Sequence, residues 1–285
     1  MKFSLSTNWC NRRIESGEEI ADTALELGFG ELELGYHTTL QQVKGFKARL
    51  DQIPVGSVHA FCPVPISAPQ GYPELYSLAS FDDEDRKMAK LMIGRNIKFA
   101  AEMGADALVL HAGRVMCHSW FLPSRDLKRR VSRGRKMVDV FKRELEALLP
   151  ELEKSKVVLG LENLPYLEGF PAEWELKDLV GDWVKPWLDV GHDFVRKTKK
   201  WNVAASRISL EDVRPQTLDL SPIGLHLADS KGGDDHLPPG EGKIDFAALK
   251  DVVAAARHLV FEPNPAVSAE ALRAGLAHIR NLWTL

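Results

Sequence analysis

The stretch VVLGLENLP, residues Val157 to Pro165, predicts a strand that is buried on both faces. Its first five residues are aliphatic apart from Gly160, which is typical of a central strand in a parallel sheet covered by helices. The run then ends in Glu162, a carboxylate at the point where the strand leaves the core. Because a buried carboxylate needs a partner, this one stretch indicates both a fold and a site.

Similar apolar runs recur along the 285 residues and alternate with segments of helical period. Eight strand-then-helix units without a linker predict an α/β fold, a single closed (β/α)8 TIM barrel over residues 1–285. The alternative, an open doubly wound sheet, needs a glycine-rich turn after the first strand, where the sequence reads Asn8-Trp9-Cys10-Asn11. The predicted strands are 2–7, 31–34, 55–59, 107–111, 157–162, 184–189, 223–226 and 259–262, and the clearest predicted helices are 18–27, 82–103, 127–149, 246–255 and 268–283.

Composition and charge limit the classes of partner. With 45% hydrophobic and 27% charged residues, the chain has a globular composition. Its formal net charge of −3 gives no general attraction to nucleic acid or to an anionic membrane. No long apolar stretch follows Met1, so we expect no secretory signal or spanning helix and a cytoplasmic protein. Three scattered cysteines argue against a disulfide framework.

Residue types that bind metals stand at the ends of six consecutive predicted strands, the third to the eighth. In a TIM barrel these ends meet at one rim, where catalytic groups lie. One such residue is most often structural, but acids and imidazoles crowded at one rim repel each other unless cations bind them. The alternative is a substrate pocket of acids without a metal. The nine candidate metal ligands are His59, His111, Glu162, Asp189, His192, His226, Asp234, His236 and Glu262.

Seven motifs carry a family resemblance over essentially the whole chain: VHAF, LVLHAG, LGLENLP, WLDVGHDF, GLHLADS, DDHLPPGEGKIDF and VFEPNP. With these the chain resembles the xylose isomerase-like TIM barrels grouped with endonuclease IV, also called AP endonuclease family 2. The resemblance implies one of two branches. Sugar isomerases and epimerases hold one Mn2+ or similar ion on positions matching Glu162, Asp189, His226 and Glu262. Endonuclease IV-like phosphodiesterases hold three Zn2+ ions and also use the other five candidates.

Charge favours the phosphodiesterase branch as the main interpretation. Three Zn2+ against four carboxylates leave about +2, which suits a phosphate anion, whereas one ion against three carboxylates leaves about −1 and suits a neutral polyol. Imidazole and carboxylate ligands fit up to three Zn2+ but also Mn2+. In hydrolysis Glu162 would bridge two ions; in the alternative, a sugar or sugar-phosphate isomerase or epimerase, Glu162 and Glu262 would be the catalytic base and acid. A DNA repair nuclease and a non-catalytic binding barrel are weaker alternatives.

The expected partner is a small phosphorylated substrate. A basic run after the fourth strand, from Arg125 to Lys136, could steer a phosphate, but the rim lacks the interleaved basic and aromatic loops expected of a DNA-binding surface. The segments HAFCPVP and LYSLASFDDEDRKMA are similar to the cobamide-remodelling phosphodiesterases, which implies a corrinoid nucleotide loop as substrate. The long loop 60–81 is a candidate lid. Candidate substrate contacts are Tyr72, Arg114, Trp120 and Lys231.

Overall fold

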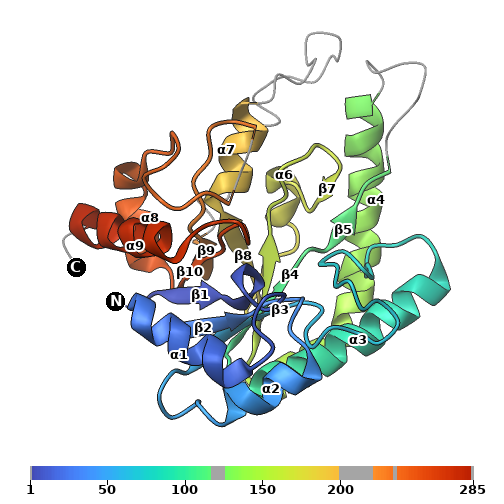
Figure 1. The fold of residues 1–285 in the computed structure, drawn as a ribbon. Coiled ribbons are helices and arrows are strands. Elements are labelled where there is room, and N and C mark those ends of the chain that lie inside the picture. The colour runs from blue at the N-terminus through green and yellow to red at the C-terminus, as the bar shows by residue number, and fades with distance from the viewer. Residues whose placement is uncertain (1, 117–125, 199–220, 234–235, 284–285) are drawn as a thin grey trace.

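Eight parallel strands close into a barrel, as the sequence predicts (Figure 1). The computed structural model describes residues 2–116, 126–198, 221–233 and 236–283. Around the barrel the order is β1-β10-β9-β8-β6-β4-β3-β2, and β1 pairs with both β10 and β2. The barrel strands are β1 (Ser4–Ser6), β2 (Glu31–Leu34), β3 (Val55–His59), β4 (Ala107–Leu110), β6 (Val158–Glu162), β8 (Val184–Asp189), β9 (Gly224–His226) and β10 (His258–Phe261).

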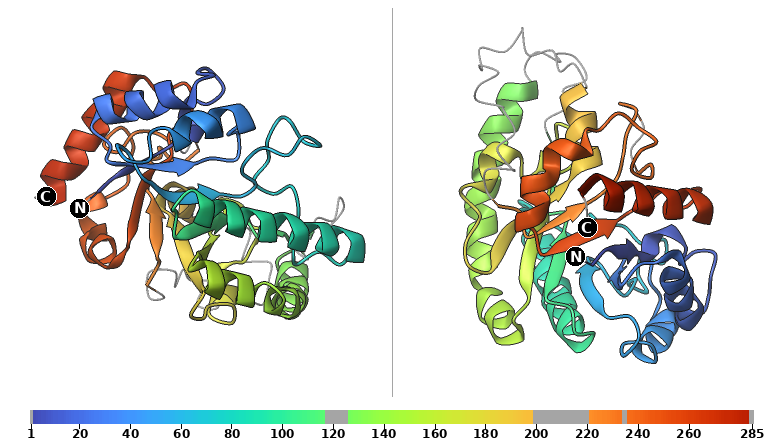
Figure 2. Two further views of the ribbon diagram at one scale, coloured as in Figure 1. Left: turned by 90° about the horizontal axis from the view of Figure 1, so that it is seen from below. Right: turned by 90° about the vertical axis from the view of Figure 1, so that its left-hand side faces the viewer.

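Helices surround the barrel, as two further views show (Figure 2). Their apolar faces pack against the strands in one large core. The helices are α1 (Gly17–Leu27), α2 (Leu40–Lys47), α3 (Asp83–Glu102), α4 (Asp126–Glu146), α5 (Leu149–Ser155), α6 (Glu173–Leu176), α7 (Val190–Thr198), α8 (Lys250–Ala255) and α9 (Ala269–Trp283), with 3-10 turns η1 (Thr7–Trp9) and η6 (Phe246–Leu249).

Local sequence explains where several helices begin and end. The Ser16 side chain accepts a hydrogen bond from the backbone of Glu19 at the start of α1, and Gly28 ends that helix with φ +94°, a conformation that glycine adopts without strain. Thr39 and Gln42 form a capping box at the start of α2. The predicted helix 127–149 corresponds to α4, whereas the short helices α2 and α5 were not among the predicted helices. Pro150 lies in the first turn of α5, where proline is tolerated.

A small second sheet lies outside the barrel. The two-stranded antiparallel sheet β5 (Gly113–Arg114) and β7 (Gly169–Phe170) joins the segments that follow β4 and β6.

No helix among the described residues is long and apolar enough to cross a membrane. The thiols of Cys10 and Cys62 are buried and free, and burial raises the pKa of the Cys10 thiol to about 12.

Trp187 fills the interior of the barrel below the rim. It is fully buried and packs with Ala107, Val109 and Val260. Its neighbours across the sheet are glycines: a Cβ atom on Gly224 would lie 2.4 Å from Trp187 Cζ3. The large indole ring therefore depends on the absence of side chains on the adjacent strands.

We predict that Gly224→Ala destabilises the protein by about 1–3 kcal/mol, because overpacking a full core shifts its side chains. Gly94→Ala, within α3, is the matched control. A Cβ atom at Gly94 would meet only Leu148 Cδ2, at an ordinary contact distance of 3.7 Å. That control should be neutral or gain up to about 1 kcal/mol. Urea unfolding of both variants measures the difference, and equal stabilities would contradict this role of Trp187.

Candidate metal centre

Eight of the nine predicted ligands meet at the carboxyl ends of the strands; the ninth, Asp234, lies outside the described residues. Four of them are the last residues of β3, β6, β8 and β9, while His111 and Glu262 directly follow β4 and β10. His192 lies in the first turn of α7, and His236 is in the loop after β9. Most of these side chains are buried, with His236 the most exposed of the eight. The convergence that the sequence predicts is therefore present.

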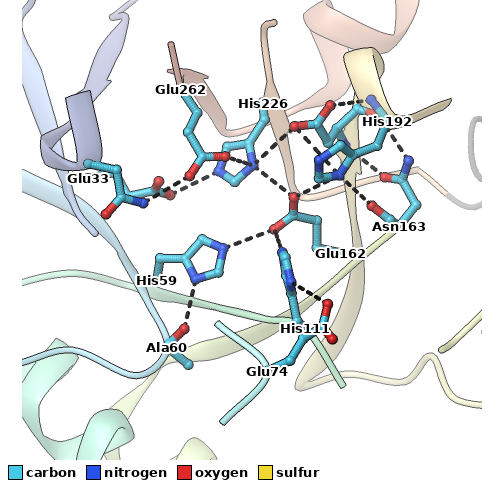
Figure 3. Close-up of polar contacts among 12 residues, drawn as sticks. Glu33, His59, Ala60, Glu74, His111, Glu162, Asn163, His192, His226 and Glu262 are labelled. Carbon is cyan, nitrogen blue, oxygen red and sulfur yellow. Dashed lines mark hydrogen bonds and ion pairs between the residues drawn. The ribbon is translucent and has the colours of Figure 1, made fainter. Parts of the chain in front are cut away.

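The carboxylate of Glu162 lies at the centre of this group (Figure 3). Its Oε2 atom is 3.1 Å from Nε2 of His59 and 3.1 Å from Nε2 of His111. Its Oε1 atom is 3.2 Å from Nδ1 of His226 and 3.4 Å from Nδ1 of His192. The two oxygens thus face two different sets of histidines, which is the arrangement of a bridging carboxylate.

Among the described residues, three sets of ligand atoms are compact enough to hold an ion. Within each set one ligand atom per residue lies within 4.8 Å of the others. Glu162 belongs to two of the sets, and Asp189 also belongs to two. The sets are a quartet of Glu162, Asp189, His226 and Glu262, a triad of His59, His111 and Glu162, and a triad of Asp189, His192 and His236.

Most of the ligand histidines have a hydrogen bond at one ring nitrogen, which fixes the orientation of the ring and leaves the other nitrogen for an ion. Nδ1 of His59 lies 2.9 Å from the carbonyl of Ala60, and Nδ1 of His236 lies 2.8 Å from the carbonyl of Glu262. Nε2 of His226 is 3.2 Å from the carboxylate of Glu33. An N–H that donates to an oxygen leaves the opposite nitrogen with a lone pair for a metal. His236 also has φ +59°, a conformation uncommon outside glycine, and its carbonyl accepts from the backbone of Asn264.

Two asparagines orient the carboxylates. Asn8 Nδ2 donates to Oε1 of Glu262 over 3.0 Å, across the closure of the barrel between β1 and β10. The side chain of Asn163 accepts from the backbone N–H of Asp189 at 2.7 Å and donates to its carbonyl at 2.9 Å. These contacts link the end of β1 to that of β10 and the end of β6 to that of β8.

The electrostatics of the group are those of crowded buried charges. Burial opposes ionisation of Glu162, yet His111 and His226 hold the pKa of its carboxyl well below the usual range. Burial also opposes a charge on His111, but Glu162 outweighs it and raises the pKa of that ring to about 9. The carboxylates of Glu33, Glu262 and Glu162 raise the pKa of His226 in the same way, against the effect of burial. For Asp189 burial is the larger effect, and its pKa is raised.

A divalent cation fits the quartet. Oxygens of Glu162 and Glu262 each lie 3.2 Å from Nδ1 of His226, and an oxygen of Asp189 lies 3.7 Å from the same atom. A single ring N–H cannot donate well to three carboxylates. The Oδ2 atom of Asp189 is buried and has no hydrogen-bond partner in the part of the chain that the structure describes, which leaves its lone pairs available. Carboxylate and imidazole donors suit Zn2+ and Mn2+.

The described residues among the predicted substrate contacts belong to none of the three ligand sets. Arg114 pairs with Glu74 and stacks over Tyr166 at 4.3 Å from the ring centre. Tyr72 and Lys231 are exposed, and Trp120 lies outside the described residues. Glu74 also pairs with His111, at 3.6 Å from Nδ1. In the predicted basic run, Arg130 is fully buried and forms a bidentate pair with Glu175, so it is not available to a phosphate.

Sequence reasoning missed Glu33, Glu74, Asn8 and Asn163. A signal existed for Glu33, because Glu31 and Glu33 alternate with leucines in a strand that a closed barrel buries on both faces. No comparable signal marks Glu74, which comes from the long loop after β3.

A family model described as xylose isomerase-like TIM barrel matches residues 21–282. The chain therefore belongs to this family, which confirms the resemblance drawn from its motifs. None of the curated proteins compared with the chain matches it.

Solved structures share the fold at low identity. One is 3-keto-D-glucoside 4-epimerase, YcjR, from E. coli, in its apo form, with TM-score 0.67, 20% identity and 99% of each chain covered. Another is a D-tagatose 3-epimerase-like protein, with TM-score 0.66, 19% identity and 99% of each chain covered. A third is the IolI protein with a bound zinc atom, with TM-score 0.62 and 12% identity over 100% of this chain and 98% of that one.

We predict that a divalent ion stabilises the protein through this centre. At an ion concentration about 100 times Kd the gain is about 2.7 kcal/mol, or roughly 5–10 °C in Tm for a chain of this size. Thermal melts of chelator-treated protein with and without Zn2+ or Mn2+ measure the shift. Glu162→Gln should abolish it, whereas His258→Gln, which alters a buried histidine paired with Asp106 outside the group, should retain it. A wild-type Tm that neither ion moves would contradict the centre.

Proposed function

We propose that the protein is a divalent-metal-dependent isomerase or epimerase acting on a small sugar or sugar derivative. The observation that carries the proposal is the quartet itself, in which two glutamates from different strands, Glu162 on β6 and Glu262 after β10, reach one ion position. The names of the structural neighbours support this activity, the alternative in the sequence interpretation, better than phosphodiester hydrolysis.

The reaction needs a proton to leave a carbon next to a carbonyl and return on the other face or at the next carbon. A bound ion supplies Lewis acidity that polarises the carbonyl and the neighbouring hydroxyl. Glu162 is ionised, since its pKa is lowered, and can accept the proton. Glu262, whose Oε1 accepts a hydrogen bond from Asn8, would deliver the proton that returns on the other face of the carbon. His59 and His111 lie beside Glu162, where their Nε2 atoms can form hydrogen bonds with substrate hydroxyls.

A second candidate function is phosphodiester hydrolysis by a multinuclear centre, the main interpretation from the sequence. The specific observation in its favour is the two triads that flank the quartet and share Glu162 and Asp189 with it. In this case the histidines would be neutral ligands and Glu162 would bridge two ions through its two oxygens. Bound ions would activate water and neutralise a phosphate. A small phosphorylated substrate, a corrinoid nucleotide loop among them, belongs to this candidate.

His59→Ala separates the candidates, whereas Glu262→Gln tests a residue that both candidates need. For an isomerase we predict that Glu262→Gln lowers kcat by about 10²–10⁴-fold, the usual contribution of a general acid or base. His59→Ala, which leaves the quartet intact, should keep the ion and part of the activity. For a hydrolase His59→Ala should instead remove an ion and abolish turnover.

The measurements are ions per chain, by elemental analysis of protein purified without chelators or a metal-affinity tag, and turnover on ketose and phosphodiester panels. One ion per chain with sugar turnover supports the isomerase. Two or three ions with phosphodiester turnover would replace it by the second candidate.

A further inference from the structure

Glu33 is a fully buried carboxylate directly beside the quartet, on β2 (Figure 3). Its Oε2 atom accepts a hydrogen bond from Ser57 Oγ at 2.8 Å and lies 3.2 Å from Nε2 of His226. Its Oε1 atom has no hydrogen-bond partner among the described residues. In the described part of the chain, His226 is the one basic group within ion-pair distance of Glu33.

A buried carboxylate without a cationic partner is costly, so the contact with His226 is energetically important. If Nε2 donates its N–H to Glu33, the Nδ1 lone pair points at oxygens of Glu162 and Glu262, each 3.2 Å away. A lone pair facing two carboxylates is repulsive unless a cation lies between them. A cation at Nδ1 in turn makes Nε2–H a stronger donor to Glu33. The Glu33 contact and an ion at the quartet therefore reinforce each other.

Packing leaves the imidazole few other orientations. The ring of Trp187 meets that of His226 edge to face, with centroids 5.3 Å apart. The ring of His59 stacks on that of His226, with centroids 5.9 Å apart. Glu33 therefore selects which nitrogen carries the proton, while the ring plane is set by its neighbours.

We infer that Glu33 is a positioning residue that holds His226 with Nδ1 free to bind the ion of the quartet. This inference rests on the proposed metal centre, and it applies equally to the isomerase and to the hydrolase because both use His226. It assigns Glu33 no contact with substrate.

The strand provides a matched control. Glu31, two residues earlier on β2, accepts a hydrogen bond from Ser4 Oγ at 2.7 Å, as Glu33 does from Ser57, but it has no histidine contact among the described residues. Ser57→Ala removes the other partner of Glu33 and leaves His226 in place. Glu33→Gln keeps the shape and an oxygen acceptor but removes the charge.

Zn2+ affinity of the intact chain, measured by competition with a chromophoric chelator, tests the inference. We expect Glu33→Ala to weaken binding about 10–100-fold, the usual effect of losing a partner behind a ligand, and Glu33→Gln to weaken it less. Glu31→Ala and Ser57→Ala should stay within about 3-fold of wild type. The Co2+ absorption spectrum should change in Glu33→Ala and not in the two controls, because it reports ligand geometry.

Three results would overturn the inference. Wild-type affinity and spectrum in both Glu33 variants would show that His226 is oriented without it. Losses of Zn2+ affinity in Glu31→Ala or Ser57→Ala as large as in Glu33→Ala would show that substitutions on β2 and β3 weaken binding through a general structural effect and not through the Glu33–His226 contact. No bound ion in the wild type would remove the proposed centre as well, whereas in the first two cases that centre stands. Glu33→Gln decides the matter if Glu33→Ala does not fold.

Discussion

The convergence of buried carboxylates on Glu162 and His226 is the constraint on which the rest of the rim depends. The closed barrel brings the ends of six strands together, and each end contributes a polar side chain where the apolar run stops. In a site with almost no solvent these charges need compensation within a few ångströms. The imidazoles, the side-chain amide of Asn8 and the backbone N–H of His192 supply part of it, and a bound cation could supply the rest.

Rigidity below the rim makes this convergence possible. Trp187 fills the barrel interior because Gly160 and Gly224 leave room for the indole, and its edge contacts the ring of His226. On its other face it stacks on His258, near the opposite end of the barrel. The ring of His226 thus packs against a buried side chain of the barrel interior. By contrast, the second carboxylate near His111 is that of Glu74, which comes from the loop after β3.

The strands and the ligands could be predicted from sequence because both depend on local pattern. Six of the eight barrel strands carry a His or an acid as their last residue or directly after it, and parallel strands in a closed barrel bring those ends to one rim. The supporting residues follow no local rule. Asn8 meets Glu262 across 254 positions, and Glu33 meets His226 across 193, so only the closed barrel makes them neighbours. Short elements such as α2 and the β5–β7 pair were missed because they are too short for a clear period.

The number of bound ions and the protonation state of the histidines are linked, because both compensate the same buried negative charge. Glu33, Glu162, Asp189 and Glu262 carry four negative charges when ionised, and all four are buried. One divalent ion leaves two of these charges, which protonated rings such as His111 can balance, and imidazolium groups then face the substrate as donors. Two or more ions balance the carboxylates themselves, so the histidines stay neutral and act as ligands. The isomerase and the hydrolase thus differ in which cation, a proton or a metal, occupies the space beside Glu162.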